Sequence, residues 1–317
     1  MTGTHGLVSI VIPVYNGSAT IAELATRLLA VFRQIGRDCE ILLVNDGSQD
    51  ESWQTIAALA ASHTEVRGYN LMRNFGQHNA LLAGIRQARG DITVTMDDDL
   101  QNPPEEVPKL LEMVDQGHDV VYGVPVGGRH GLFRDFASVA AKFALRVGLG
   151  YEHASHTSAF RAFKTRLRGA FTDFAAKYVS IDVLLTWATT DFSWVVVQHD
   201  ERTSGRSGYT LRKLLSHTIN MVTSFSPLPL RIASLVGFVF MAFGIVILLY
   251  SLSVFIIHGR SVPGFTFLAS IIAIFSGVQL FSLGIIGEYI GRIHQRVLDQ
   301  PSYVIADTTP GSEEPKP

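Results

Sequence analysis

The sequence predicts an α/β domain built on a mostly parallel sheet, followed by two membrane-spanning helices. Up to residue 123, short apolar runs alternate with segments of helical spacing. The apolar runs are nearly continuous, which is typical of parallel strands covered by helices on both faces. After Arg231 come two uncharged runs, each longer than the roughly 20 residues that cross a bilayer as a helix.

The alternation places each element of the soluble part. The expected strands are residues 7–15, 39–46, 66–72, 91–97 and 119–123, and the expected helices are 18–35, 51–62, 77–89 and 103–116. Ser18 is a candidate N-cap for the first helix, and two prolines suit the start of the last one. No internal repeat is present, and we expect the polar, Pro-rich end "TTPGSEEPKP" to be disordered.

Composition excludes several classes of protein. A length of 317 residues allows one large domain or two ordinary ones, and a net charge of -2 argues against general nucleic-acid binding. The single cysteine, Cys39, excludes a disulfide within one chain and is expected to be a small core residue. The N-terminus runs directly into a strand without a charged leader, so no signal peptide is expected.

The two uncharged runs are Ile232–Ile257 and Val262–Gly287, joined by "HGRS". A buried helical hairpin in a soluble protein is the alternative, but two adjacent runs of this length favour membrane helices. Residues 209–225 place apolar side chains on one helical face and lead into the first run. This segment is therefore predicted to be an interfacial helix rather than a core-packing one. Lys and Arg flank the hairpin's outer ends, which places both ends in the cytoplasm.

Polar residues follow four of the expected strands. The first strand ends in Pro13, Tyr15 and Asn16, the second ends in "NDGSQD" with Asp46 and Asp50, and the third is followed by "RNFGQH". The fourth ends in the cluster of Asp97, Asp98 and Asp99, with Gln101 two residues beyond it. Any one of these could be turn chemistry, since "NDGS" is a common turn. Ligands of parallel sheets bind beyond the carboxyl ends of the strands, so four polar ends together indicate a site. The glycine patterns of dinucleotide-binding and P-loop proteins are absent from the sequence.

The three consecutive aspartates favour a metal site over a solvated turn. Adjacent carboxylates repel one another and resist desolvation unless a cation or hydrogen bonds compensate them. Side chains alternate along a strand, so Asp97 and Asp99 share a face and Asp98 points away as a capping or structural residue. Asp99 and Gln101 can then both present oxygens to a hard divalent cation.

Four segments resemble the successive motifs of family 2 glycosyltransferases with the GT-A fold. They are "VSIVIPVYN", "ILLVNDGSQD", "LMRNFGQHNALLAGIRQARGD" and "MDDDLQNPPEEVPKLL". The chain is most similar to the branch that loads a sugar onto a polyprenyl phosphate. Dolichyl-phosphate mannosyltransferases, bactoprenol glucosyltransferases and the undecaprenyl-phosphate aminoarabinose transferase belong to that branch. The resemblance continues through "DERTSGRSGYTLRKLL" to "GEYIGRIHQRVLDQPSYVI", so it covers nearly the whole chain. Gly17 departs from it, because relatives usually carry a glutamate there.

The resemblance implies that a sugar moves from a nucleotide-diphospho-sugar to a polyprenyl phosphate, with inversion at the anomeric carbon. Asp97 would orient the nucleotide sugar, and Asp99 and Gln101 would ligate Mg²⁺ or Mn²⁺. The cation would stabilise the charge that builds on the leaving nucleoside diphosphate. The residues implied for the nucleoside are Pro13 and Tyr15, at the base, and Asp46.

The acceptor needs cations more than it needs a base. A phosphomonoester has a second pKa of about 6 and is mostly a dianion at neutral pH. Arg134 and Ser138 in "FRDFASVAAK" match the acceptor-phosphate segment of the family, and Arg202 and Ser207 are further candidates. Arginine suits phosphate oxygens because it can bind them bidentately. The alternatives are solvated arginines and ordinary hydroxyls.

Two other functions remain open. A processive polysaccharide synthase of the same fold would carry a Gln-x-x-Arg-Trp motif and more membrane helices, which this sequence lacks. A non-enzymatic, membrane-anchored nucleotide-sugar binder would not need the aspartate cluster. The sequence names neither the sugar nor the nucleotide.

The resemblance further implies a bacterial inner-membrane protein with a cytoplasmic catalytic domain and cytoplasmic termini, forming a homo-oligomer such as a tetramer. We expect a catalytic domain over residues 1–205, an interfacial helix region over 206–230, a transmembrane hairpin over 231–290 and a cytoplasmic tail over 291–317.

Overall fold

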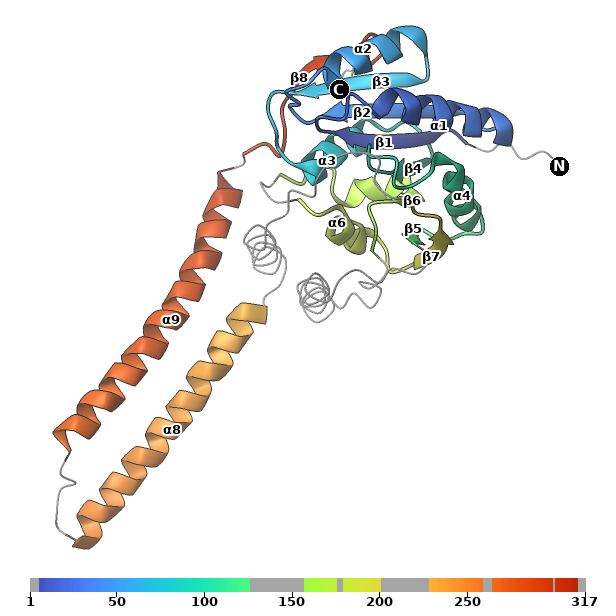
Figure 1. Cartoon of the computed structure of the whole chain (residues 1–317). Coiled ribbons are helices and arrows are strands. Elements are labelled where there is room, and N and C mark those ends of the chain that lie inside the picture. Colours follow the sequence, from blue (N-terminus) through green and yellow to red (C-terminus); the bar gives the residue numbers. More distant parts are fainter. Residues whose placement is uncertain are drawn as a thin grey trace. The chain divides into compact units, whose positions relative to one another are not determined.

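A computed structural model describes residues 6–125, 157–175, 179–200, 228–258, 264–298 and 300–312. The described residues fall into two compact units. The first contains a β-sheet, its covering helices and residues 300–312, and the second contains the two long helices α8 and α9 (Figure 1).

Every strand and helix predicted before residue 123 is present. The strands of the first unit are β1 Val8–Val14, β2 Cys39–Asn45, β3 Val66–Leu71, β4 Ile92–Thr95, β5 Val120–Pro125, β6 Arg161–Lys164, β7 Phe192–Val197 and β8 Ile305–Thr308. Its helices are α1 Ile21–Ile35, α2 Ser52–Ser62, α3 Gln77–Gln87, α4 Val107–Asp115 and α6 Ile181–Ala188, with short 3-10 turns at Pro104–Glu106 and Thr165–Ala170. The sequence pattern did not identify β6, β7, β8 or α6.

The described strands form one sheet in the order β7-β5-β6-β4-β1-β2-β3-β8. β1 pairs in parallel with β2 and β4, and β2 pairs in parallel with β3. β6 is antiparallel to its neighbours β4 and β5, and β8 is antiparallel to β3. The mostly parallel sheet is therefore confirmed. The ends of β1 to β4 meet at one side of the sheet, called here the carboxyl edge.

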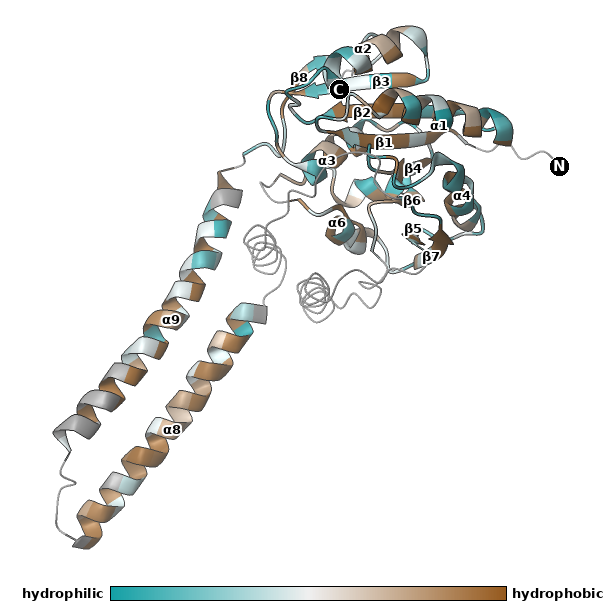
Figure 2. Ribbon diagram, in the orientation of Figure 1, coloured by the Kyte–Doolittle hydropathy of each residue, from teal (hydrophilic) through white to brown (hydrophobic). Residues whose placement is uncertain are grey.

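Burial explains why the strand sequences are nearly continuous apolar runs. All seven residues of β1 are buried. Helix α3 packs against β1 and β2 and adjoins α6, while α1 adjoins α2 and the 3-10 turn that precedes α4. Figure 2 shows the resulting pattern, with β1 coloured as hydrophobic and α1 carrying both hydrophobic and hydrophilic residues. One detail differs from the prediction. Helix α1 begins at Ile21 with Thr20 as its N-cap residue, so Ser18 does not cap it.

The predicted disorder of the C-terminal segment is wrong for residues 308–312. After the two long helices the chain returns to the sheet, where β8 pairs with β3. Thr309 and Ser312 are buried, and the Gly68 N–H donates to Thr309 Oγ1 over 2.8 Å. Pairing covers the outer edge of β3, whose backbone groups would otherwise lack partners in the sheet.

The second unit is a pair of apolar helices, α8 Leu228–His258 and α9 Phe265–Val297. They pack through an edge-to-face contact of the Phe240 and Phe275 rings, with centroids 6.0 Å apart. Each helix holds a stretch long and apolar enough to cross a membrane, Pro229–Ile257 and Ile274–His294. Among the described residues, the second stretch overlaps the predicted run 262–287. The expected interfacial helix over 209–225 lies outside the described residues.

Candidate active site at the carboxyl edge

The loops that follow β1 and β2 are bonded to each other. The Asn16 N–H donates to Ser48 Oγ over 2.9 Å, and the Gln49 N–H donates back to Asn16 Oδ1 over 2.9 Å. Asn16 adopts a left-handed backbone conformation with φ of 54°, which asparagine tolerates better than most residues. The turn thereby exposes Tyr15 at the carboxyl edge, whereas Pro13 is buried inside β1.

Asp46 joins the β2 end to the loop after β3. Its two carboxylate oxygens accept the N–H groups of Phe75 and Gly76 over 2.7 and 2.9 Å. Burial raises the pKa of Asp46, and these two hydrogen bonds act in the opposite direction. Asp46 is buried, so its most evident role is to hold the 73–76 loop in place at the edge.

Two further contacts close a ring of four loops. Gln77 Nε2, at the start of α3, donates to Asp97 Oδ1 over 2.6 Å. The Tyr15 N–H lies 3.4 Å from Asp98 Oδ2. The loops after β1, β2, β3 and β4 are therefore linked in sequence and back to the first. Tyr15, Asp46 and Asp97, all predicted site residues, lie in this ring.

The aspartates lie in a turn beyond β4, which ends at Thr95, so strand alternation does not govern their directions. The turn bends back at Leu100, whose backbone is left-handed with φ of 61° while its side chain is buried. A non-glycine residue in this conformation costs about 1 kcal/mol or more and is typical of functional sites. At this bend the backbone N–H of Gln101 donates to Asp99 Oδ1 over 3.2 Å, so the Asp99 carboxylate is held against the backbone of the second predicted metal ligand.

The residues present fit a hard divalent cation. Asp99 and Gln101 are both partly exposed, and each offers a side-chain oxygen of the kind that Mg²⁺ and Mn²⁺ prefer. Among the described residues, no group of three or more His, Cys, Asp or Glu side chains could hold a metal ion. A cation at this turn would thus complete its coordination with oxygens from a phosphate group and water, as Mg²⁺ commonly does.

Asp98 contacts the loop after β1, a contact that the sequence pattern missed. Its carboxylate lies over Gly17, where an added Cβ would come within 2.2 Å of Asp98 Oδ2. Burial raises the pKa of Asp98 to about 7, and the adjacent charges of Asp97 and Asp99 raise it too. The available signal was Gly17 itself, because a glycine in a site loop often marks a close approach.

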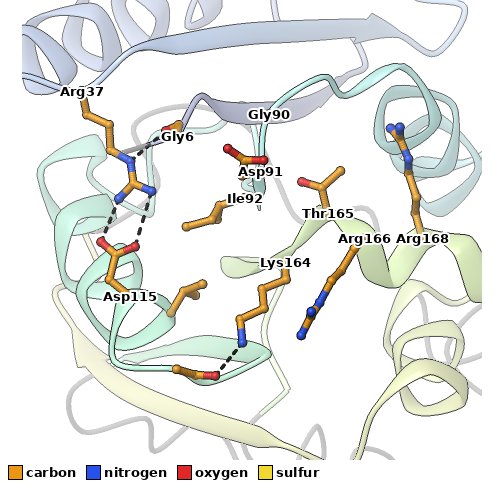
Figure 3. Close-up of a pocket in the computed structure, with 12 residues that line it drawn as sticks. Gly6, Arg37, Gly90, Asp91, Ile92, Asp115, Lys164, Thr165, Arg166 and Arg168 are labelled. Carbon is orange, nitrogen blue, oxygen red and sulfur yellow. Dashed lines mark hydrogen bonds and ion pairs between the residues drawn. The ribbon is translucent and has the colours of Figure 1, made fainter. Parts of the chain in front are cut away.

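A cavity of about 690 Å³ lies at the other end of the strands from the carboxyl edge, near the start of β4 (Figure 3). Its cations already have partners in the protein. Arg37 pairs with Asp115 over 2.9 Å, and Lys164 donates to the Gly117 carbonyl over 2.6 Å. Arg168 likewise donates to backbone carbonyls at the end of α3. This cavity therefore does not compete with the carboxyl edge as the substrate site.

The predicted acceptor residues Arg134, Ser138, Arg202 and Ser207 lie outside the described residues. Nothing in the structure bears on them.

Comparisons with known families agree with the geometry. The family model for glycosyl transferase family 2 matches residues 9–171, and the model for the GtrB C-terminal hairpin matches residues 228–293. The undecaprenyl-phosphate 4-deoxy-4-formamido-L-arabinose transferase of Pectobacterium carotovorum subsp. carotovorum (strain PC1) is 36% identical over 95% of this chain and 93% of its own length. The same-named protein of Shewanella sediminis (strain HAW-EB3) is 36% identical over 96% and 93%.

Solved structures identify the fold. Glucosyl-3-phosphoglycerate synthase from Mycobacterium tuberculosis, in complex with Mn²⁺, uridine diphosphate and phosphoglyceric acid, aligns with a TM-score of 0.52 and 18% identity. The alignment covers 69% of this chain and 76% of that chain. The predicted GT-A architecture is thereby confirmed. The aspartate turn, the ring of loops and the C-terminal hairpin all occur in a chain that belongs to glycosyl transferase family 2.

Proposed function

We propose that this glycosyltransferase moves a sugar from a nucleotide-diphospho-sugar to a polyprenyl phosphate of the undecaprenyl type, with inversion, on the cytoplasmic face of a bacterial plasma membrane. The observation that supports the proposal is the combination of the partly exposed Asp99 and Gln101 in the turn beyond β4 with two membrane-length apolar helices in one chain. The curated relatives, named as undecaprenyl-phosphate transferases, align over both parts of the chain.

The donor would lie along the carboxyl edge. Asp99 and Gln101 hold a divalent cation that, when bound, neutralises charge on the leaving diphosphate. Asp97, fixed by Gln77, orients the nucleotide sugar. Tyr15 is half exposed and available to a base, whereas buried Pro13 and Asp46 shape that site from beneath.

The acceptor would be a dianionic phosphate that attacks without losing a proton to the protein. Arg134 and Arg202 would hold its oxygens, and Ser138 and Ser207 would donate hydrogen bonds to them. The homo-oligomeric state and the boundaries at 205 and 230 are part of the same proposal, but the segment after the hairpin is not a separate tail, because β8 joins the sheet of the catalytic domain.

One assay tests the proposed reaction. Membranes containing the protein are incubated with undecaprenyl phosphate, Mg²⁺ or Mn²⁺, and a panel of UDP-, GDP- and dTDP-sugars, and the lipid product is identified by mass. We expect one glycolipid carrying a single sugar, and the 4-deoxy-4-formamido-L-arabinose donor is the first to include because of the relatives' names. A long polymer would favour the processive synthase, and binding without turnover would favour a nucleotide-sugar binder.

A further inference from the structure

The carboxyl edge continues past β4 into β6. Because β6 is antiparallel to β4, its first residue, Arg161, pairs with Thr95, the last residue of β4. Arg161 also pairs with Tyr122 of β5 on its other side. Arg161 and Tyr122 therefore lie at the same edge as Asp97, which follows Thr95 by two residues.

Arg161 is buried, with 1% of its surface exposed, and it anchors a carboxylate. Its Nε donates to Thr95 Oγ1 over 3.1 Å, and its Nη1 forms an ion pair with Oδ1 of Asp182, in the first turn of α6. The Tyr122 hydroxyl donates to the same oxygen over 2.9 Å. Two donors thus hold one oxygen of Asp182 in a single place.

The other oxygen of Asp182 remains available. In the part of the chain that the structure describes, no hydrogen bond is made by Asp182 Oδ2, and the side chain is 21% exposed. The residue before it, Ile181, donates its N–H to His78 Nδ1 over 3.4 Å. His78 follows Gln77, the partner of Asp97. Asp182 is therefore tied to the Asp97 turn through Thr95 on one side and through α3 on the other.

Strand order predicts which part of the donor meets Asp182. A nucleotide sugar is linear, with the diphosphate between the nucleoside and the sugar. The proposed nucleoside residues follow β1 and β2, and the proposed cation ligands follow β4. The sugar would then lie on the far side of β4, over β6 and β5. This step rests on the proposed function.

The chemistry of a carboxylate limits which groups of the nucleotide sugar Asp182 can bind. An ionised carboxylate only accepts hydrogen bonds, whereas the phosphates of both substrates carry negative charge and offer no donor. Sugar hydroxyls and amides do offer donors. Arg161 neutralises Asp182, so the pair adds little net charge that would repel the diphosphate. We propose that Asp182 binds a hydroxyl or N–H group of the transferred sugar, and that Arg161 and Tyr122 are positioning residues that hold it there.

The test compares nucleotides with and without a sugar. Asp182→Asn is titrated, in the full-length protein with Mn²⁺, with UDP-, GDP- and dTDP-sugars and with UDP, GDP and dTDP. We expect binding of the preferred nucleotide sugar to weaken roughly 10- to 100-fold, the range of one charged hydrogen bond, with no change for the sugar-free nucleotide. Asp115→Asn is the control, because it also removes a carboxylate from a buried arginine, but at the opposite side of the sheet. It should leave both affinities unchanged.

Two results would overturn the inference. One is unchanged binding of nucleotide sugars, and the other is an equal loss for sugar-free nucleotides. Should Asp182→Asn unfold, Tyr122→Phe keeps the ion pair and removes one bond to the carboxylate. That variant should weaken nucleotide-sugar binding about threefold and spare the sugar-free nucleotide, and any other pattern would also overturn the inference. These titrations need no lipid, so a failure of the proposed transfer to undecaprenyl phosphate is detected separately, by the glycolipid assay.

Discussion

Gly17 and Asp98 show how one residue can depend on another that lies far away in the sequence. Their positions differ by 81 residues, yet a methyl group on Gly17 would occupy the space of the Asp98 carboxylate. Gly17 is buried in the loop between β1 and α1, which also carries Tyr15. The glycine is therefore required for close approach, because Asp98 fills the room beside it.

We expect Gly17→Ala to destabilise the protein by about 1–3 kcal/mol, because the Asp98 carboxylate must move. In an Asp98→Ala background the same change should cost much less, since the clashing atoms are gone. Thermal unfolding of the four proteins in this cycle measures the coupling. Gly169→Ala is the control, because an added Cβ there meets nothing within 4 Å. Additive effects at positions 17 and 98 would contradict the proposed contact.

Asp99→Asn tests the cation site. The substitution keeps the size of the side chain but removes the charge that a divalent cation needs. We expect sugar transfer to fall at least ~100-fold and metal-dependent nucleotide binding to be lost, with the fold retained. Glu105→Gln is a matched control from the same loop region, where the carboxylate pairs with Arg27 at the surface over 2.6 Å. An Asp99→Asn protein that is fully active in EDTA would exclude the metal role.

At the scale of elements, β8 makes the catalytic domain discontinuous in sequence. The sheet is begun by residues before the hairpin and completed by residues after it. Thr309, just past β8, exchanges two hydrogen bonds with Gly68: it accepts the Gly68 N–H through Oγ1 over 2.8 Å and donates its own N–H to the Gly68 carbonyl over 3.0 Å. A catalytic domain cut before the first long helix would therefore lack its outer strand.

We predict that Thr309→Val lowers the free energy of unfolding by about 1–3 kcal/mol, because a buried N–H loses its acceptor while side-chain volume is kept. Thr308→Val, at the exposed neighbour in β8, should change stability by less than ~0.5 kcal/mol. Chemical denaturation of the purified protein in detergent compares the two variants. Equal effects would show that the Thr309 hydroxyl does not hold the edge.

For the whole molecule, orientation in the membrane follows from the charges that flank the hairpin. Arg231 directly precedes the first uncharged run, 232–257, and Arg292 follows the second, 262–287, while the connection between the two long helices carries only Arg260. Lys and Arg favour the cytoplasmic side, so the sheet unit and both hairpin ends should face the cytoplasm. Donor nucleotide sugars would then reach the site from within the cell.

Cysteine labelling checks this orientation. Burial, with the charges of Glu65 and Asp38, raises the pKa of Cys39 to about 12, so the native protein should react poorly with maleimides near neutral pH. In intact cells, an impermeant maleimide should label Ser261→Cys in the connection but not Ala306→Cys on exposed β8. Ser302 is a poor reporter because only 4% of it is exposed. The opposite labelling pattern would reverse the orientation, and Ala306→Cys must react after permeabilisation for the result to count.

The sequence by itself determined the features that depend on neighbours along the chain. Nearly continuous apolar runs predicted β1 to β5, and two long uncharged runs predicted the hairpin. The run of aspartates predicted a metal site at the end of the fourth strand, which stays a prediction. Periodicity and hydropathy are local properties, so they survive without knowledge of the fold. The motifs around Asp97 and Gln101 also carried the family resemblance.

Only the tertiary structure decided the contacts between distant residues. β8 is a four-residue strand, too short to show a pattern, and it pairs with β3 across more than 230 residues. β6 is equally short, and its antiparallel direction is what brings Arg161 to the carboxyl edge. Whether Asp98 points away from the site or over Gly17 likewise depends on how the loops after β1 and β4 meet. Such choices are made by packing between elements, which leaves no period in the sequence.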